Sequence, residues 1–360
     1  MIKKTIFFIL LGVLISRTGL WAQDPVYTQF SNSILSYNPA YTGLYEGLHI
    51  RFVTRNQAPA LETSVRSYNF SADLADRNLP GSGGLGLVVN TDNEGAGFVN
   101  KYNLGVSFAV RVPFTRSIVG QMGIKAGLLR KYIDWDEFER SKTTDERYGY
   151  LSDSAYVRPN VNSINRPDFG VGGVVQFVNR MGCLSGTVGL SADHLFEPDE
   201  SFLETEKAPL PRKWTASADL VWSVKCHSGY NAVKSDVMKL NPGIVIQHQG
   251  KMSTLMAGMN ATKYGLYLGL WYRGEFGTYQ SNAASLIAGY RYVFAENMSI
   301  KFTYSYDKPL SGMQMETGGA HEISLVLEFN TLKLFKGSGS AAYRSSGPQH
   351  LDNQLAQLAL

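Results

Sequence analysis

The sequence feature that most constrains the fold is strict alternation of apolar and polar side chains along segments of roughly 8 to 12 residues. This period of two is the pattern of a β-strand with one apolar face. Strands of soluble sandwiches average about 5 to 6 residues, whereas a strand that crosses a membrane needs about 9 to 11. The length of the segments therefore favours a membrane-spanning barrel. One of them places its apolar side chains at Tyr102, Leu104, Val106, Phe108, Val110 and Val112.

Such segments recur about fourteen times, and an even number is what single-chain bacterial barrels have. The connections at residues 134–168 and 193–212 are long, whereas those at 113–117 and 295–298 are short. Long outer loops and short periplasmic turns are typical of outer-membrane barrels. The sequence therefore predicts an all-β fold, a transmembrane antiparallel β-barrel of about 14 strands over residues 48–330. The predicted strands start near Leu48, Val65, Leu85, Tyr102, Ile118, Phe169, Leu184, Lys213, Leu240, Ser253, Leu266, Ser285, Ser299 and His321.

The first 22 residues have the layout of a cleavable signal peptide, with Lys3 and Lys4 at the start, an apolar run, and Ala22 before Gln23. The apolar run is shorter than the about 20 residues that a spanning helix needs. A retained N-terminal anchor is the competing interpretation, but Arg17 interrupts the run. We therefore expect an exported protein whose mature chain starts at Gln23.

Composition and motifs exclude several classes of function. The 360-residue chain has a net charge of +4, and no block of basic residues indicates a nucleic-acid partner. Gly81, Gly83 and Gly86 have the spacing of a dinucleotide-binding loop, but an alternating strand follows where the phosphate-binding helix would begin. We interpret them as glycines at a turn and on a crowded barrel wall.

Catalytic and metal-binding chemistry is not predicted either. Asp193 and His194 suggest part of a hydrolytic triad, yet nothing marks a nucleophile, and we interpret both as solvated loop residues. The six histidines are scattered and the two cysteines are far apart, without the spacing of metal ligands. We expect no catalytic residue, cofactor or metal.

Charged side chains on the polar faces of the strands are expected to line the barrel interior. They would form an ion-selective pore, or they would pair with one another and with a plug; the sequence leaves both interpretations open. These residues are Arg51, Arg111, Lys125, Arg291, Lys301 and Asp307.

The two cysteines, Cys183 and Cys226, are predicted to lie on the same rim of the barrel, at the start of the seventh strand and just after the eighth. A disulfide between neighbouring strands is one expectation, because an exported protein meets an oxidising compartment. Two separate thiols are the other, because an error of one residue in register would misalign the pair.

Residues 23–47, between the signal and the first strand, are rich in aromatic and turn-forming residues. A turn is predicted at the Asn-Pro pair, since proline pushes the residue before it out of helical space, and a glycine permits a second reversal. We expect this plug-like segment to begin in the periplasm and to fold into the lumen or against the periplasmic rim, closing the pore and presenting a partner surface; a flexible leader is the alternative. Its key residues are Tyr27, Phe30, Tyr37, Asn38, Pro39, Tyr41 and Gly43.

Several stretches together resemble a known family. The opening DPVYTQFSNSILSYNPAYTG, the following RFVTRNQ and YNFSADL, and the closing HEISLVLEF are similar to the PorP/SprF family of type IX secretion system membrane proteins from Bacteroidota. The resemblance implies an integral protein of the outer membrane that supports secretion or surface anchoring of adhesins, including those of gliding motility, through their C-terminal sorting domains. It implies outer-membrane lipid and periplasmic secretion and gliding components as further partners.

Two points stay outside that resemblance. Residues 331–360 depart from the family pattern and are expected to form a polar C-terminal tail. A passive porin for small solutes is the alternative function, although a porin has little need for an aromatic, turn-rich leader.

Overall fold

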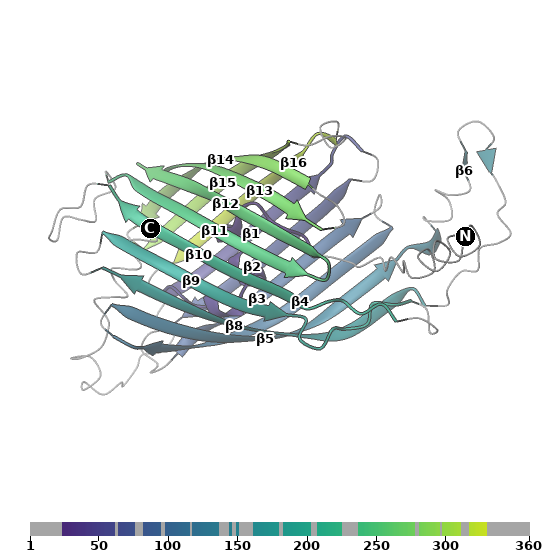
Figure 1. Cartoon of the computed structure of the whole chain (residues 1–360), viewed down its shortest axis with the longest axis horizontal. Coiled ribbons are helices and arrows are strands. Elements are labelled where there is room, and N and C mark those ends of the chain that lie inside the picture. The colour runs from purple at the N-terminus through teal and green to yellow at the C-terminus, as the bar shows by residue number, and fades with distance from the viewer. Residues whose placement is uncertain are drawn as a thin grey trace, which may run out of the picture.

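A closed barrel of fourteen antiparallel strands is the main element of the computed structural model, with β1 paired to β16 (Figure 1). The all-β class and the strand number predicted from the sequence are confirmed. No helix in the described part of the chain is long and apolar enough to cross a membrane. The structure describes residues 24–61, 64–75, 82–94, 98–115, 117–136, 144–145, 149–150, 161–179, 183–202, 207–224, 237–277, 281–295, 297–310 and 317–329.

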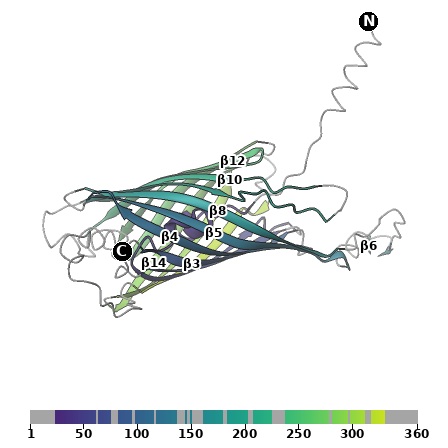
Figure 2. The same cartoon turned by 90° about the horizontal axis from the view of Figure 1, so that it is seen from below.

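The barrel strands follow one another in chain order, and each pairs with the next. A separate two-stranded sheet, β6 (Thr144–Asp145) with β7 (Gly149–Tyr150), lies between β5 and β8 in the chain, beyond the end of the barrel (Figure 1, Figure 2). The barrel strands are β1 (Gly47–Gln57), β2 (Val65–Ala75), β3 (Ser82–Glu94), β4 (Val99–Pro113), β5 (Ile118–Ile133), β8 (Ser163–Val178), β9 (Leu184–Asp193), β10 (Lys213–Ser223), β11 (Lys239–Gln249), β12 (Met252–Lys263), β13 (Leu266–Phe276), β14 (Ser281–Ala295), β15 (Met298–Pro309) and β16 (Ala320–Phe329).

One predicted boundary is clearly wrong. Strand β8 begins at Ser163, six positions before the predicted Phe169, so the connection predicted at residues 134–168 is shorter. Most of the extra residues are polar, and one is Pro167, so they break the apolar alternation. They are strand because β5 is long enough to pair with them, as Pro167 opposite Leu128 shows.

The strands present an apolar face outward and a small or polar face inward. In β4, Val106 and Phe108 are 56% and 46% exposed, whereas Ser107 and Ala109 beside them are buried. Exposed apolar side chains on every second residue are what a barrel in lipid requires. The hydrophobic surface of this chain therefore surrounds the barrel, and the polar residues face its interior.

The two ends of the barrel differ in their connections. At the end where β1 begins and β16 ends, several turns are short, such as Tyr264 and Gly265 between β12 and β13. We call this the turn end and the opposite one the loop end, since residues 134–162 and 194–212 connect strands there. In outer-membrane barrels the short turns face the periplasm and the long loops face outward.

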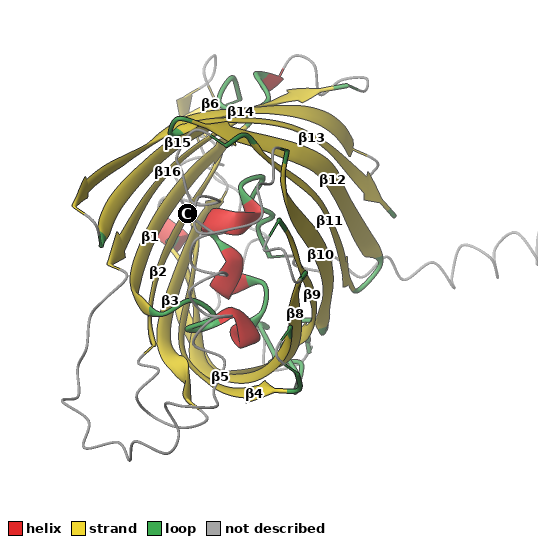
Figure 3. Cartoon of the chain, turned by 90° about the vertical axis from the view of Figure 1, so that its left-hand side faces the viewer, coloured by secondary structure: helices red, strands yellow, loops and turns green. Residues whose placement is uncertain are grey.

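Residues 24–46 lie inside the barrel, and we call them the inner segment (Figure 3). They form three short 3₁₀ turns, η1 (Phe30–Asn32), η2 (Ile34–Ser36) and η3 (Pro39–Tyr41). The Asn38 side chain caps η3 by accepting the Ala40 N–H at 2.8 Å, and Pro39 follows it, where a backbone donor is not needed. The turn predicted at this Asn-Pro pair is present.

Candidate functional site

The inner segment starts at the loop end of the barrel. The Asp24 carboxylate accepts hydrogen bonds from Lys213 Nζ at 2.6 Å and Lys101 Nζ at 3.1 Å, and it lies 2.8 Å from His194 Nε2. These three residues stand at the loop-end termini of β10, β4 and β9. The Asp24 N–H also donates to Gln249 at the same end of β11, at 3.1 Å.

The segment then crosses the lumen lengthwise and reaches the turn end. Its Gly43 N–H donates to Asp73 at 2.9 Å, and its Leu44 carbonyl accepts from Arg111 Nη1 at 3.0 Å. Asp73 and Arg111 lie in the turn-end parts of β2 and β4. The segment therefore starts at the loop end, where the basic groups that pair with Asp24 stand, and that it begins in the periplasm stays a prediction.

Asp24 and His194 favour each other's charged form. Burial raises the pKa of Asp24, but the charges of Lys213, His194 and Lys101 outweigh it and hold that pKa well below its usual value. Burial lowers the pKa of His194, but the Asp24 charge and the Asp168 hydrogen bond to Nδ1, at 2.9 Å, raise it above its usual value. The buried imidazole therefore lies between two carboxylates that favour its charged form.

This arrangement corrects the interpretation of Asp193 and His194 as solvated loop residues. Both are 0% exposed. Asp193 faces the lumen and pairs with Lys125, and His194 bridges Asp24 and Asp168. The sequence could not show this, because the groups that bury them come from distant strands and from the inner segment.

A second polar cluster binds the inner segment a few residues further along the chain, at Thr28 and Gln29. The Thr28 and Gln29 N–H groups donate to the Glu322 carboxylate at 2.9 and 2.8 Å. Thr28 Oγ1 donates to Asp307 at 2.7 Å. Arg55 lies 3.1 Å from Glu322 and 2.8 Å from Asp307, so both carboxylates share one cation. The two carboxylates of the barrel wall are thus balanced by Arg55 and by hydrogen-bond donors of the inner segment.

The predicted lumen-facing charges all lie on the inward side of the wall. Ion pairs join Arg51 to Asp73, Lys125 to Asp193, Arg291 to Glu328 and Asp307 to Arg55, and Arg111 donates to a carbonyl of the inner segment. Lys301 differs, because its ammonium lies 5.5 Å from the ring centre of Tyr267 and forms no ion pair within the described residues.

Glycines on the inner wall make room for the Asn38-Pro39 turn. A Cβ added at Gly172 of β8 would collide with the Asn38 side chain, and one at Gly123 of β5 would collide with the Pro39 carbonyl. These two contacts leave no space for a side chain. The wall and the turn are therefore complementary in shape.

The same complementarity explains the glycines of the GSGGLG stretch that lie in β3. A Cβ at Gly84 would lie 2.7 Å from the Cα of Gly43, and one at Gly86 would lie 2.9 Å from a methyl group of Thr42. Gly43 itself has φ +61°, a conformation that side chains disfavour. These positions bring two backbones together; Gly81 lies outside the described residues.

The aromatic side chains of the inner segment pack against one another. The rings of Phe30 and Tyr37 are 4.9 Å apart, and Tyr41 meets Phe30 edge to face at 6.4 Å. Tyr37 Oη donates to the Tyr27 carbonyl at 3.0 Å and accepts the Tyr27 N–H at 2.7 Å, which ties the two arms of the segment together. Burial raises the pKa of Tyr37 and Tyr41, so both phenols are neutral.

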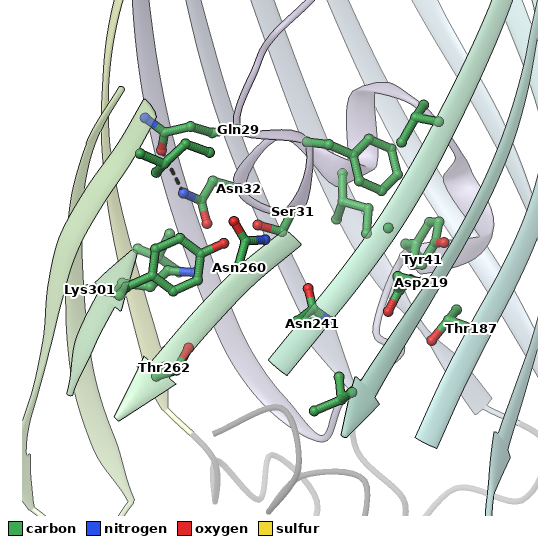
Figure 4. A pocket seen from close by; sticks show the side chains of 18 of the residues that line it. Gln29, Ser31, Asn32, Tyr41, Thr187, Asp219, Asn241, Asn260, Thr262 and Lys301 are labelled. Atoms are coloured by element: carbon green, nitrogen blue, oxygen red, sulfur yellow. Dashed lines mark hydrogen bonds between the residues drawn. The ribbon is translucent and has the colours of Figure 1, made fainter. Parts of the chain in front are cut away.

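A cavity of about 210 Å³ remains beside the segment, in the turn-end half of the barrel (Figure 4). Lys301 and Thr262 lie on one side of it, and Asp219 and Thr187 lie on the other. In the described part of the chain, no group of three or more His, Cys, Asp or Glu residues is suited to a metal ion.

Cys183 immediately precedes β9 at the turn end and is disulfide-bonded. Cys226, the other cysteine of the sequence, lies outside the described residues. The pairing of the two therefore stays a prediction.

The sequence did not identify Asp24, Arg55, Asp73 or Glu322 as parts of this site. The last three fall on the polar faces of predicted strands, so the alternation that identified the other lumen-facing charges could have found them. Asp24 carried no such signal, because its role depends on the path of the inner segment.

Comparison with known proteins gives one family. Residues 20–327 match the family described as type IX secretion system membrane protein PorP/SprF. No curated protein matches. Among solved structures, a Pseudomonas putida toluene transporter, TodX, has 8% identity and a TM-score of 0.44, with 87% of this chain and 100% of that chain covered. A Pseudomonas aeruginosa FadL homologue has 11% identity and a TM-score of 0.41, with 87% and 95% covered.

Proposed function

Because the chain belongs to the PorP/SprF family of type IX secretion system membrane proteins, we propose that it supports secretion or surface anchoring of adhesins through their C-terminal domains. In this proposal it is an integral protein of the outer membrane without catalytic activity. It handles cargo together with the periplasmic components of the secretion and gliding systems.

The observation that carries this proposal over a passive porin is the inner segment. Its aromatic side chains are buried in the lumen, with Tyr27 1% and Tyr37 2% exposed, and buried charges bind it near both ends. A porin keeps a water-filled channel. Because the inner segment occupies the lumen and is bound to the wall near both ends, we expect the barrel at rest not to conduct ions.

The turn end is the surface we propose for the secretion components. By the general topology of outer-membrane barrels it faces the periplasm, and the inner segment reaches it at residues 43–46 before β1 begins. Tyr45 lies there against His49, with ring centres 6.2 Å apart. A partner that binds at this end would contact both the barrel and the segment, so the segment links partner binding to the state of the lumen.

The test uses the native host. A strain that lacks the gene is complemented with the full chain or with a chain from which residues 24–45 are deleted while the signal and the barrel are kept. The deleted barrel is expected to insert but to conduct ions in planar bilayers and to leave adhesin missing from the cell surface, as measured by surface proteomics. Heat-modifiable mobility on gels serves as the control for insertion.

Two outcomes would contradict the proposal. If the strain without the gene displays adhesin normally and takes up small solutes more slowly, the protein is a porin. If the deleted barrel conducts no more than the full one and still displays adhesin, the inner segment neither closes the pore nor supports cargo handling.

A further inference from the structure

The backbone pairing of β10 with β11 lacks two residue pairs in the turn-end half of the closed barrel. The ladder of paired residues stops at Asp219 opposite Gly243 and resumes at Trp222 opposite Leu240. Two pairs between these points are missing, although the register is the same on both sides. We call this interruption the seam.

Pro242 accounts for the seam. The register places it opposite Leu220, and proline has no N–H with which to donate to the facing strand. The side chain of Asn241 replaces the lost donor, since its Nδ2 donates to the Leu220 carbonyl at 2.7 Å. Because a bilayer offers no water to an unpaired carbonyl, this side chain lets a wall in lipid tolerate the missing pair.

The cavity beside the inner segment reaches the seam. Its lining includes Val221 of β10 and Asn241 and Gly243 of β11, from both edges of the interruption. It also includes Ile244, whose side chain is 40% exposed on the outer face of the barrel. The residues that line the cavity therefore lie on both sides of the two missing pairs.

The cavity combines an apolar surface with cationic groups. Lys301 is among its lining residues and forms no ion pair within the described residues, while the neighbouring Glu328 is already paired with Arg291. Asp219 lines the cavity as well, on the side opposite Lys301. The apolar part of the lining includes Phe30, Ile34, Leu44, Val245, Trp271 and Ile287.

We propose that this cavity binds a single-chain amphiphile with an anionic head, such as a long-chain fatty acid, which enters from the bilayer through the seam. The carboxylate binds Lys301, where a charge-assisted hydrogen bond replaces its hydration. The alkyl chain lies against the apolar lining and extends toward Gly243 and the seam. This site goes beyond the handling of adhesins and does not depend on it.

The test uses the full chain in lipid nanodiscs and a palmitic acid that carries a photoreactive diazirine. Adducts mapped by mass spectrometry are expected at Val245 and Trp271, and unlabelled palmitate should compete. Lys301→Met is expected to raise the half-saturating concentration about tenfold, since it removes a hydrogen bond to a charged group. Gly173→Ala is the matched control, because a Cβ there meets nothing within 4 Å.

A second variant separates the route from the site. Pro242→Ala restores the missing N–H donor, so it should slow labelling from the bilayer several-fold and leave the final extent unchanged. Equal rates for this variant and the parent would show that the ligand enters from the turn end and would overturn the seam. The proposed site would be contradicted by adducts confined to lipid-facing residues. It would also be contradicted if Lys301→Met left the half-saturating concentration unchanged. Even if a variant fails to fold, the map of adducts on the wild-type chain shows whether the ligand binds in the cavity.

Discussion

The side chains of Asp24 and His194 lie 2.8 Å apart although 170 positions separate them in the chain. The first belongs to the start of the inner segment, and the second follows the loop-end terminus of β9. This pair fixes the direction in which the segment passes through the barrel. It also gives the clearest experimental access to the segment's path.

The path can be tested with single cysteines. Pro25→Cys is expected to react with a membrane-impermeant maleimide added to intact cells, because residue 25 adjoins Asp24 at the loop end. Glu46→Cys, at the turn end, should react only after the outer membrane is permeabilised. Labelling is measured above the wild-type background. The reverse pattern would mean that the barrel is inserted with its loop end in the periplasm.

The Asp24–His194 pair predicts a pH dependence of the segment's attachment. The pKa of His194 is raised above its usual 6.5, so its contribution is complete below pH 6.5 and is lost as the pH rises through the raised value. The pKa of Asp24 is lowered below its usual 3.8, so its contribution is complete above that pH and is lost as the pH falls through the lowered value. Attachment should be strongest between these two usual values.

Hydrogen exchange of the inner segment, followed across pH, is the measurement for that window. After correction for intrinsic exchange, protection should fall on the alkaline side. His194→Gln should abolish this alkaline loss and leave the acid side in place. A wild-type profile that stays flat above pH 6.5 would show that the imidazole does not hold Asp24.

The glycines of the wall predict a specific steric effect. Gly172→Ala places a methyl group where the Asn38 side chain lies, so it should displace the turn and lower the free energy of unfolding by about 1–3 kcal/mol. Gly173→Ala, the neighbouring position with open space, should change it by less than about 0.5 kcal/mol. Urea unfolding measures both, and equal effects would contradict the tight fit.

The Tyr37 hydroxyl is expected to hold the two arms of the inner segment together. Tyr37→Phe removes its hydrogen bonds to the Tyr27 N–H and carbonyl and leaves those buried groups unpaired, at a cost of about 1–3 kcal/mol. Hydrogen exchange at the Tyr27 amide should become faster by a corresponding factor. Tyr290→Phe, on the half-exposed outer face, is the control. An unchanged Tyr27 amide would show that the aromatic packing alone suffices.

The cysteine prediction needs only a chemical assay. If Cys183 and Cys226 are bonded to each other, unfolded but unreduced protein should take up no alkylating reagent, and reduced protein should take up two equivalents. Uptake before reduction would contradict the pairing.

The barrel could be predicted from the sequence because its cause is local. Alternation such as Tyr102 to Val112 reports which face of each strand meets lipid, and the strand number follows from counting these segments. The start of β8 was missed because its polar residues are strand only through pairing with β5. Local pattern carries no information about that partner.

The inner segment was predictable only in part, for the same reason. Asn38, Pro39 and Gly43 determine turns by their own backbone preferences, and these turns were expected. The direction of the segment depends on Lys101, His194 and other groups that come from distant strands, and no local signal reports it. Loop position suggested a solvated His194, whereas three-dimensional pairing buries it.

The close fit between the Asn38-Pro39 turn and Gly123 has a consequence for the order of assembly. Contacts this tight leave no room for the aromatic residues of the inner segment to pass through the lumen of a barrel that has already closed. The barrel closes by joining β1 to β16, the first and last strands to be synthesised. The segment must therefore be seated while that joint is still open, so the wall is built around a template that the chain itself supplies.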